Sequence, residues 1–192
     1  MMAIELSGML IAVVTLVIAV VSVVRSRRQP PPSGWFLHDG PLVAVHVLGA
    51  WIFLPFGVGR ALAYGAFTVG TSVWFMTCVC PHCVSFGREN GMSVFCHLSR
   101  RLASKGDRQL FPRRFRLNFV VMGIESLLPI VAGVTLVCRS FGSGWRFGYD
   151  LFLFVSFGVI AFYLLPSACQ PGCKECEMRS DCPWGSQWSS GR

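Results

Sequence analysis

Residues 4–24 read IELSGMLIAVVTLVIAVVSVV and are followed directly by Arg25-Ser26-Arg27-Arg28. A helix over these 21 residues would be roughly 31 Å long at about 1.5 Å per residue, enough to cross the hydrocarbon core of a bilayer. A cleaved signal peptide carries its positive charges before the apolar core, whereas here they follow it. The stretch therefore predicts a retained transmembrane helix, with residues 1–28 as the first segment and the amino end outside.

The composition of the whole chain also indicates a membrane protein. Of its 192 residues, 53% are hydrophobic and 14% are charged, and the mean hydropathy is +0.57. A soluble domain carries roughly 25% charged residues. The net charge of +8 comes from basic residues that flank apolar stretches. We therefore expect contact with the lipid bilayer and no binding of nucleic acid.

The remaining chain divides at prolines, cysteines and apolar stretches. Consecutive prolines predict a stiff linker over 29–40, and two apolar runs predict a helical hairpin of two spans over 41–77. One span followed by a re-entrant segment is the alternative for that hairpin. Hydropathy then predicts a Cys-rich basic loop over 78–116, a fourth span over 117–138, a fifth span over 147–166 and a Cys-rich tail over 167–192. The expected fold class is an all-α integral membrane protein with five transmembrane helices and a small Cys-rich cytoplasmic loop and tail.

The distribution of basic residues favours five spans. With the amino end outside, fourteen of the seventeen Lys and Arg residues face the cytoplasm, as the positive-inside rule requires. Only Arg60, Arg139 and Arg146 then lie outside. The sequence thus predicts a multi-pass protein of the cell membrane whose Cys-rich tail is cytoplasmic.

The 78–116 loop contains apolar residues at helical spacing, namely Val94, Phe95, Leu98 and Leu102, with basic residues among them. This pattern predicts a short helix in the headgroup region. A solvated basic loop is the alternative.

Eight of the nine cysteines form two groups. A Cys-x2-Cys pair presents two thiolates from one tight turn, and two such pairs can complete a four-thiolate shell around a metal. Each group contains one pair, Cys80/Cys83 and Cys173/Cys176. The predicted metal ligands are Cys78, Cys80, Cys83, Cys96, Cys169, Cys173, Cys176 and Cys182. The ninth, Cys138, is expected to be an ordinary buried small residue.

Both groups resemble known metal-binding motifs. The tail run from Cys169 to Pro183, with close cysteines and one before a proline, resembles the cluster-binding run of ferredoxins, although its spacing differs. That resemblance implies an iron–sulfur cluster. Cys80-Pro81-His82-Cys83 resembles a zinc knuckle and implies a structural zinc ion instead. Ligand type alone does not separate the two metals, and the compact, histidine-free tail favours iron–sulfur.

Thiol chemistry is a further alternative. Cys80-Pro81-His82-Cys83 is also similar to the active-site motif of periplasmic thiol oxidases of the thioredoxin fold. Membrane thiol oxidoreductases such as vitamin K epoxide reductase likewise combine Cys-x2-Cys with several spans and a quinone. The predicted orientation places these thiols in a reducing compartment, which disfavours stable disulfides.

Two ionisable residues fall inside the predicted spans. A carboxylate near mid-membrane costs about 2.5–3.5 kcal/mol on insertion scales, so Glu125 should face the bundle interior and have a partner. His46 lies at a similar depth, and the two could pair. They are the predicted catalytic residues, relaying protons or lining a quinone pocket; a purely structural hydrogen bond is the alternative. Asn118, seven residues before Glu125, is expected to hydrogen-bond across helices.

Together these features predict membrane-associated electron transfer through a cysteine-ligated metal site, most concretely an iron–sulfur cluster, with a redox partner protein or a quinone as acceptor. A structural zinc site in a non-enzymatic membrane protein that docks a partner or senses metal is one alternative, and a membrane thiol–disulfide oxidoreductase is another.

Overall fold

The computed structural model describes residues 2–28, 35–84, 86 and 94–168. Within helices, nothing is described of the side chains of residues 2–5, 26–28, 35–38 and 94–97. The described residues form helices and no strands. The α-helices are α1 (Met2–Arg28), α2 (Trp35–Phe53), α3 (Val58–Trp74), α4 (Val94–Leu102), α5 (Phe111–Ser140) and α6 (Trp145–Val159).

Five of these helices are long and apolar enough to cross a membrane, all except the nine-residue α4. This confirms the predicted all-α class with five candidate spans. Their outward faces are apolar too, since leucine and valine side chains such as Leu10, Val69 and Val131 are largely exposed. A soluble protein rarely exposes apolar surface so continuously. The fold is consistent with a membrane protein on length, composition and surface.

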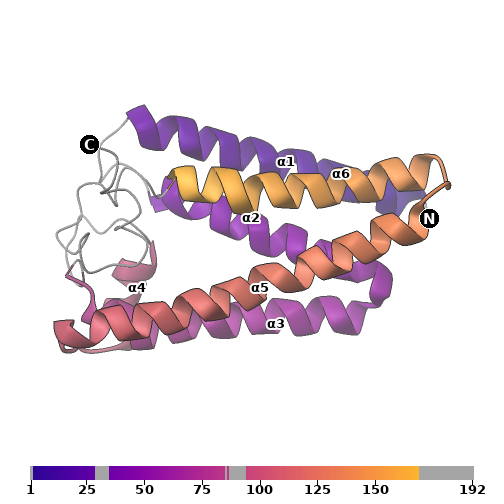
Figure 1. Cartoon of the computed structure of the whole chain (residues 1–192). Coiled ribbons are helices and arrows are strands. Elements are labelled where there is room, and N and C mark those ends of the chain that lie inside the picture. Colours follow the sequence, from indigo (N-terminus) through magenta and orange to yellow (C-terminus); the bar gives the residue numbers. More distant parts are fainter. Residues whose placement is uncertain (1, 29–34, 85, 87–93, 169–192) are drawn as a thin grey trace, which may run out of the picture.

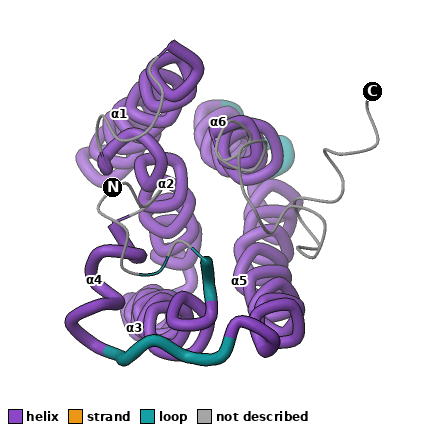
Figure 2. The backbone as a smooth tube through the Cα atoms, turned by 90° about the vertical axis from the view of Figure 1, so that its left-hand side faces the viewer, coloured by secondary structure: helices purple, strands orange, loops and turns teal. Residues whose placement is uncertain are grey.

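The five long helices run alternately up and down (Figure 1). α1, α2 and α6 form one group, while α3 and α5 lie on the other side of the bundle (Figure 2). α3 and α6 end on the same side of the molecule as α1 does. We call this side, which carries Cys80 and Cys83, the cysteine end. The opposite end carries the short turns around Gly57 and Gly142.

The main core lies between α1, α2 and α6 and also includes Ala132 and Leu136 of α5. Small residues allow the helices to approach closely, as is common in membrane bundles. Trp51 Nε1 donates a hydrogen bond of 2.9 Å to Tyr149 Oη, and both side chains pack directly on Gly8, where a Cβ would clash with them. One glycine thus allows three helices to meet at a single polar contact.

α5 changes partner along its length. Its second half packs on α6, whereas its first half packs on the end of α3 through Phe111 and Phe115. α3 is held to α2 by Tyr64, whose ring packs on Gly49 so tightly that a Cβ there would clash. These contacts place α2, α3 and α5 around a common space.

Several helix boundaries differ from the hydropathy pattern. α2 begins at Trp35, within the 29–40 segment whose prolines predicted a linker, and Pro41 lies inside it. Proline is tolerated inside membrane helices because neighbouring groups satisfy the freed backbone carbonyl. α5 begins at Phe111, before the apolar stretch. The short helix predicted in the loop is present as α4.

Two π-helical segments, Phe75–Val79 and Ile160–Leu164, extend α3 and α6 toward the cysteine end. Such segments widen a helix by one residue and frequently occur at functional sites. The segment in α3 contains Cys78 and leads directly into Cys80.

Candidate intramembrane site

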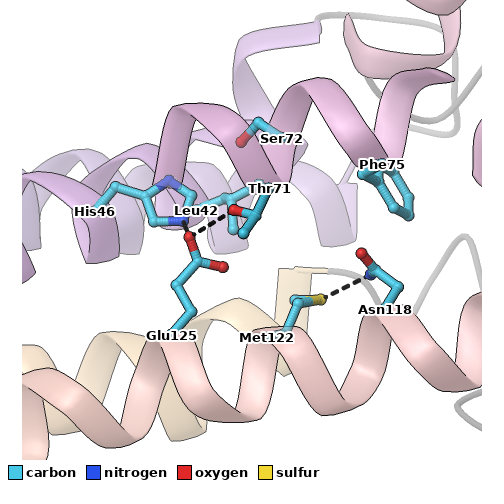
Figure 3. Close-up of a pocket in the computed structure, with 8 residues that line it drawn as sticks. All are labelled: Leu42, His46, Thr71, Ser72, Phe75, Asn118, Met122 and Glu125. Atoms are coloured by element: carbon cyan, nitrogen blue, oxygen red, sulfur yellow. Dashed lines mark hydrogen bonds and ion pairs between the residues drawn. The ribbon is translucent and has the colours of Figure 1, made fainter. Parts of the chain in front are cut away.

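Glu125 and His46 are in contact. Glu125 lies at the middle of the 30-residue α5 and is buried, on the same face as Pro129, Ala132 and Leu136. His46 Nε2, from α2, lies 3.2 Å from Glu125 Oε1 (Figure 3). The pairing predicted from their similar depth is confirmed as a contact. Their proposed catalytic role stays a prediction.

Two residues of α3 complete this site, and the sequence analysis missed both. Thr71 Oγ1 lies 3.0 Å from the same Glu125 Oε1, and Tyr64 Oη donates to the backbone carbonyl of Glu125 at 3.2 Å. Tyr64, Thr68 and Thr71 follow one another at helical spacing. That polar stripe within an apolar helix was the signal that could have revealed them.

Thr71 can satisfy Glu125 in either protonation state. Its hydroxyl oxygen lies 2.9 Å from the Thr68 carbonyl as well as 3.0 Å from Glu125 Oε1, but it carries one proton. It can donate that proton to an ionised Glu125. Alternatively, it can donate to the Thr68 carbonyl and accept the proton of a neutral Glu125. The same heavy-atom positions therefore fit both forms of the carboxyl group.

Beside the pair is a cavity of about 110 Å³, lined by Leu42, His46, Thr71, Ser72, Phe75, Asn118, Met122 and Glu125 (Figure 3). The lining residues come from α2, α3 and α5. The cavity runs along α5 from Glu125 toward the cysteine end, because Asn118 lies two turns nearer to that end. Most of its surface is apolar, as in typical small-molecule sites.

The prediction for Asn118 was wrong. It does not hydrogen-bond across helices in the described structure: its Nδ2 donates to Met122 Sδ, one turn along the same helix, at 3.2 Å. Asn118 is only 3% exposed and lines the cavity. The physical reason is that Asn118 faces the cavity between α2 and α3 and does not face the surface of a neighbouring helix.

The first cysteine group lies where α3 ends. The π-helical segment leads into a 3-10 turn, Cys80–His82, which is closed by a hydrogen bond of 3.0 Å from Cys83 N to Cys80 O. Cys80 is buried, whereas Cys78 and Cys83 are partly exposed. Cys80 and Cys83 are thus joined by one tight turn, as expected for a Cys-x2-Cys pair.

The turn is anchored to the segment that leads into α5. His82 Nδ1 lies 2.7 Å from the Asp107 carbonyl, and the ring packs on Gly106, whose amide donates to the Pro81 carbonyl at 3.0 Å. Arg114 donates to the Cys78 carbonyl at 3.2 Å. The cysteine turn is therefore fixed to α5, the helix that carries Glu125.

The structure describes only some of the eight cysteines predicted to bind a metal. Across the described ranges, no group of three or more His, Cys, Asp or Glu side chains is arranged to hold a metal ion. Cys80 and Cys83 can supply one pair of ligands. Cys96 belongs to α4, but only its backbone is described. The last described residue is 168, so the four cysteines of the tail lie outside the described residues, namely Cys169, Cys173, Cys176 and Cys182. The complete ligand set therefore stays a prediction from the sequence.

The prediction for Cys138 was wrong, because its side chain is exposed on the surface of α5 and not buried. The buried stripe of α5 passes through Leu136 and Ser140. Cys138 lies two residues from each of them and so about 200° away around the helix. It faces the surroundings of the bundle.

Comparison with models of protein families, with curated proteins and with solved structures found no match for this chain. The fold and the site define the class of protein by themselves. It has five helices of membrane-spanning length and a buried carboxylate–imidazole pair that borders a cavity between three of them.

Proposed function

We propose that this is a multi-pass membrane protein whose Glu125–His46 pair holds and releases a proton inside the bilayer. The observation that carries the proposal is the position of Glu125, buried at the middle of α5 with Oε1 in contact with His46 and Thr71. Ionisable side chains at such depth are rare, face the bundle interior and mark proton relays and ion or substrate pathways.

The arrangement favours proton exchange over a purely structural bond. The ionisable groups in contact with Glu125 are His46 from α2 and, through the backbone carbonyl, Tyr64 from α3. Carboxylate and imidazole can share one proton, and the Thr71 hydroxyl adapts to either state without movement of heavy atoms. A structural hydrogen bond would need neither the second acceptor for Thr71 nor a cavity beside the carboxyl group.

We propose that the cysteine end faces the cytoplasm. The described basic residues at this end are Arg25, Arg100, Arg101, Lys105, Arg108, Arg113, Arg114 and Arg116, whereas Arg60, Arg139 and Arg146 lie in the first or last turns of helices at the other end. This asymmetry supports the orientation because cytoplasmic segments carry an excess of Lys and Arg.

We propose further that the proton accompanies electron transfer at the cysteine end, through a metal held by the cysteines. Support comes from the two Cys-x2-Cys pairs of the sequence and from the tight turn that connects Cys80 to Cys83. Thiol–disulfide exchange is less well supported. Reactive thiolates are commonly stabilised at helix N-termini, and these two follow the C-terminal end of α3.

The proposal that Glu125 binds and releases a proton is tested by infrared spectroscopy of the full chain in lipid nanodiscs. Titration with acid should reveal the C=O stretch of a protonated carboxyl group, and Glu125→Gln should remove that band. Asp107→Asn, a change to an exposed carboxylate outside the bundle, serves as the control and should leave it. If no pH-dependent carboxyl band disappears with Glu125→Gln while the protein remains folded, the proposal is wrong.

The metal is tested separately by iron, zinc and acid-labile sulfide analysis with an absorption spectrum, on protein purified without oxygen. Iron with sulfide, absent after replacement of Cys80 and Cys83 by serine, would support electron transfer. Zinc alone would indicate a structural site, and an absence of metal would leave thiol exchange. None of these outcomes alters the test on Glu125.

A further inference from the structure

Two buried oxygen atoms that face the cavity have no hydrogen-bond donor among the described residues. One belongs to Glu125 and the other to Asn118. Leaving either oxygen without a partner would destabilise the protein, because an unsatisfied buried polar group costs about 1–3 kcal/mol. They indicate what the cavity binds.

The Asn118 amide has a defined orientation. Met122 Sδ is an acceptor only, so the amide nitrogen must be the atom that contacts it, at 3.2 Å. The carbonyl oxygen, Oδ1, then faces away from Met122, toward Phe75 (Figure 3). Because Oδ1 is always an acceptor, whatever binds beside it must donate a hydrogen bond.

Glu125 presents its second oxygen in the same way. His46 and Thr71 both contact Oε1, whereas Oε2 points away from them, on the side of the cavity where Met122 lies (Figure 3). When Glu125 is ionised, Oε2 is an acceptor too. The pocket then offers two acceptors from one face of α5, on residues whose Cα atoms are about 10.5 Å apart along the helix axis.

The space between these acceptors is apolar and small. Leu42, Phe75 and Met122 supply apolar lining. The volume of about 110 Å³ is about three quarters of that of an engineered cavity of about 150 Å³ that binds benzene, and because this cavity is not closed, part of a ligand can extend beyond it. A single aromatic ring is therefore the appropriate size. A ring with para hydroxyls carries one hydrogen-bond donor at each end, one for each acceptor.

We propose that this cavity binds a hydroquinone head group, one hydroxyl donating to Asn118 Oδ1 and the other to Glu125 Oε2. The inference deepens the proposed function and rests on the same pocket: the hydroxyl on Glu125 is the one positioned to exchange a proton with it. A cationic amine is less suitable, because the apolar side chains of Leu42, Phe75 and Met122 would surround its charge.

The test is a titration of the full chain in nanodiscs, followed by saturation-transfer NMR without oxygen and corrected with empty nanodiscs. The probes are hydroquinone and 1,4-dimethoxybenzene, which has the same ring and oxygens but no donor. Hydroquinone should bind saturably and about tenfold more tightly than the ether, since two hydrogen bonds contribute roughly 0.5–1.5 kcal/mol each. Equal binding of the two probes, or none that saturates, overturns the inference. A cavity that holds only water gives the latter result.

A variant then assigns the contact. Asn118→Leu keeps the side-chain size, removes one of the two acceptors and should weaken hydroquinone about threefold without changing the ether. Val120→Ala, on the exposed face of the same helix, is the matched control and should change neither. If Asn118→Leu does not fold, the contrast between the two probes on the unaltered protein still decides the question. Saturable binding of benzylamine with none of hydroquinone would identify an ionic site and would also overturn the inference.

The two proposals can fail separately. Loss of quinol binding with an intact Glu125 carboxyl band would remove the ligand and leave the proton site. Quinol binding without that band would leave a ligand pocket built on Asn118 and would refute proton exchange at Glu125.

Discussion

The contact between His46 and Glu125 predicts a measurable coupling energy. His46→Leu removes the donor to Glu125 Oε1 but leaves Thr71 in place, and Glu125→Gln removes the charge but keeps the shape. If the pair were a desolvated ion pair, loss of one partner would cost about 3–5 kcal/mol. Hydrogen bonds between membrane helices average about 0.6 kcal/mol and reach about 1.7 kcal/mol.

The geometry favours the smaller value. Charge-assisted N–H···O bonds are about 2.7–2.9 Å long, whereas His46 Nε2 and Glu125 Oε1 are 3.2 Å apart. Thr71 also remains as a partner for the carboxyl group after His46 is lost. We therefore expect His46→Leu to lower the free energy of unfolding by about 1–2 kcal/mol, with a coupling energy to Glu125→Gln of about 1 kcal/mol.

The assay is reversible unfolding in mixed micelles, followed by circular dichroism for the two single variants and the double variant. The control cycle combines His46→Leu with Thr135→Val, a residue farther along α5 that bonds its own helix. Changes at distant sites add within about 0.3–0.5 kcal/mol. A His46–Glu125 coupling no larger than that of the control would show that the contact does not join the two helices energetically.

Two further outcomes test the packing and the cysteines. Gly49→Ala should destabilise the protein by about 1–3 kcal/mol, because the new Cβ would overlap the Tyr64 ring. Gly70→Ala meets nothing within 4 Å and should be neutral in the same unfolding assay. Equal effects of the two variants would contradict the close approach of α2 and α3. The exposed thiol of Cys138 should react with N-ethylmaleimide in detergent faster than the buried thiol of Cys80. The rates are followed by mass spectrometry in two variants, each of which keeps only one of these two thiols. The reverse order would contradict the observed surface of α5.

The number of long helices could be predicted because each apolar run is long enough to cross a bilayer and is flanked by basic or turn-forming residues. Their ends could not. α5 extends back to Phe111 through Arg113, Arg114 and Arg116, which are good helix formers but carry charge. Hydropathy identifies the part of a helix that suits lipid and not the part that continues beyond it.

The central pair could be predicted for a different reason. Glu125 and His46 are ionisable, lie at similar depth in apolar stretches and need partners there. Thr71 and Tyr64 are uncharged and can be placed in a membrane helix without an ionic partner. Their contact with Glu125 depends on the rotation of α3 about its axis. Asn118 was misjudged for the same reason. A single sequence gives the depth of a residue in a span but not the direction in which it faces.

The structure joins two features that the sequence presents separately. Thr71, which contacts Glu125, and Cys80 lie on one continuous helical segment, nine residues and about 13 Å apart along the axis. If the cysteines hold a redox centre, as proposed above, an added electron places a unit charge about that far along the axis from Thr71. At an effective dielectric constant of about 20 such a charge contributes about 1.3 kcal/mol, so the redox state of the cysteine end and the proton on Glu125 should be coupled. Infrared titration of the carboxyl band in the oxidised and reduced protein measures this directly, and identical titrations in the two states would separate the cysteine end from the proton site.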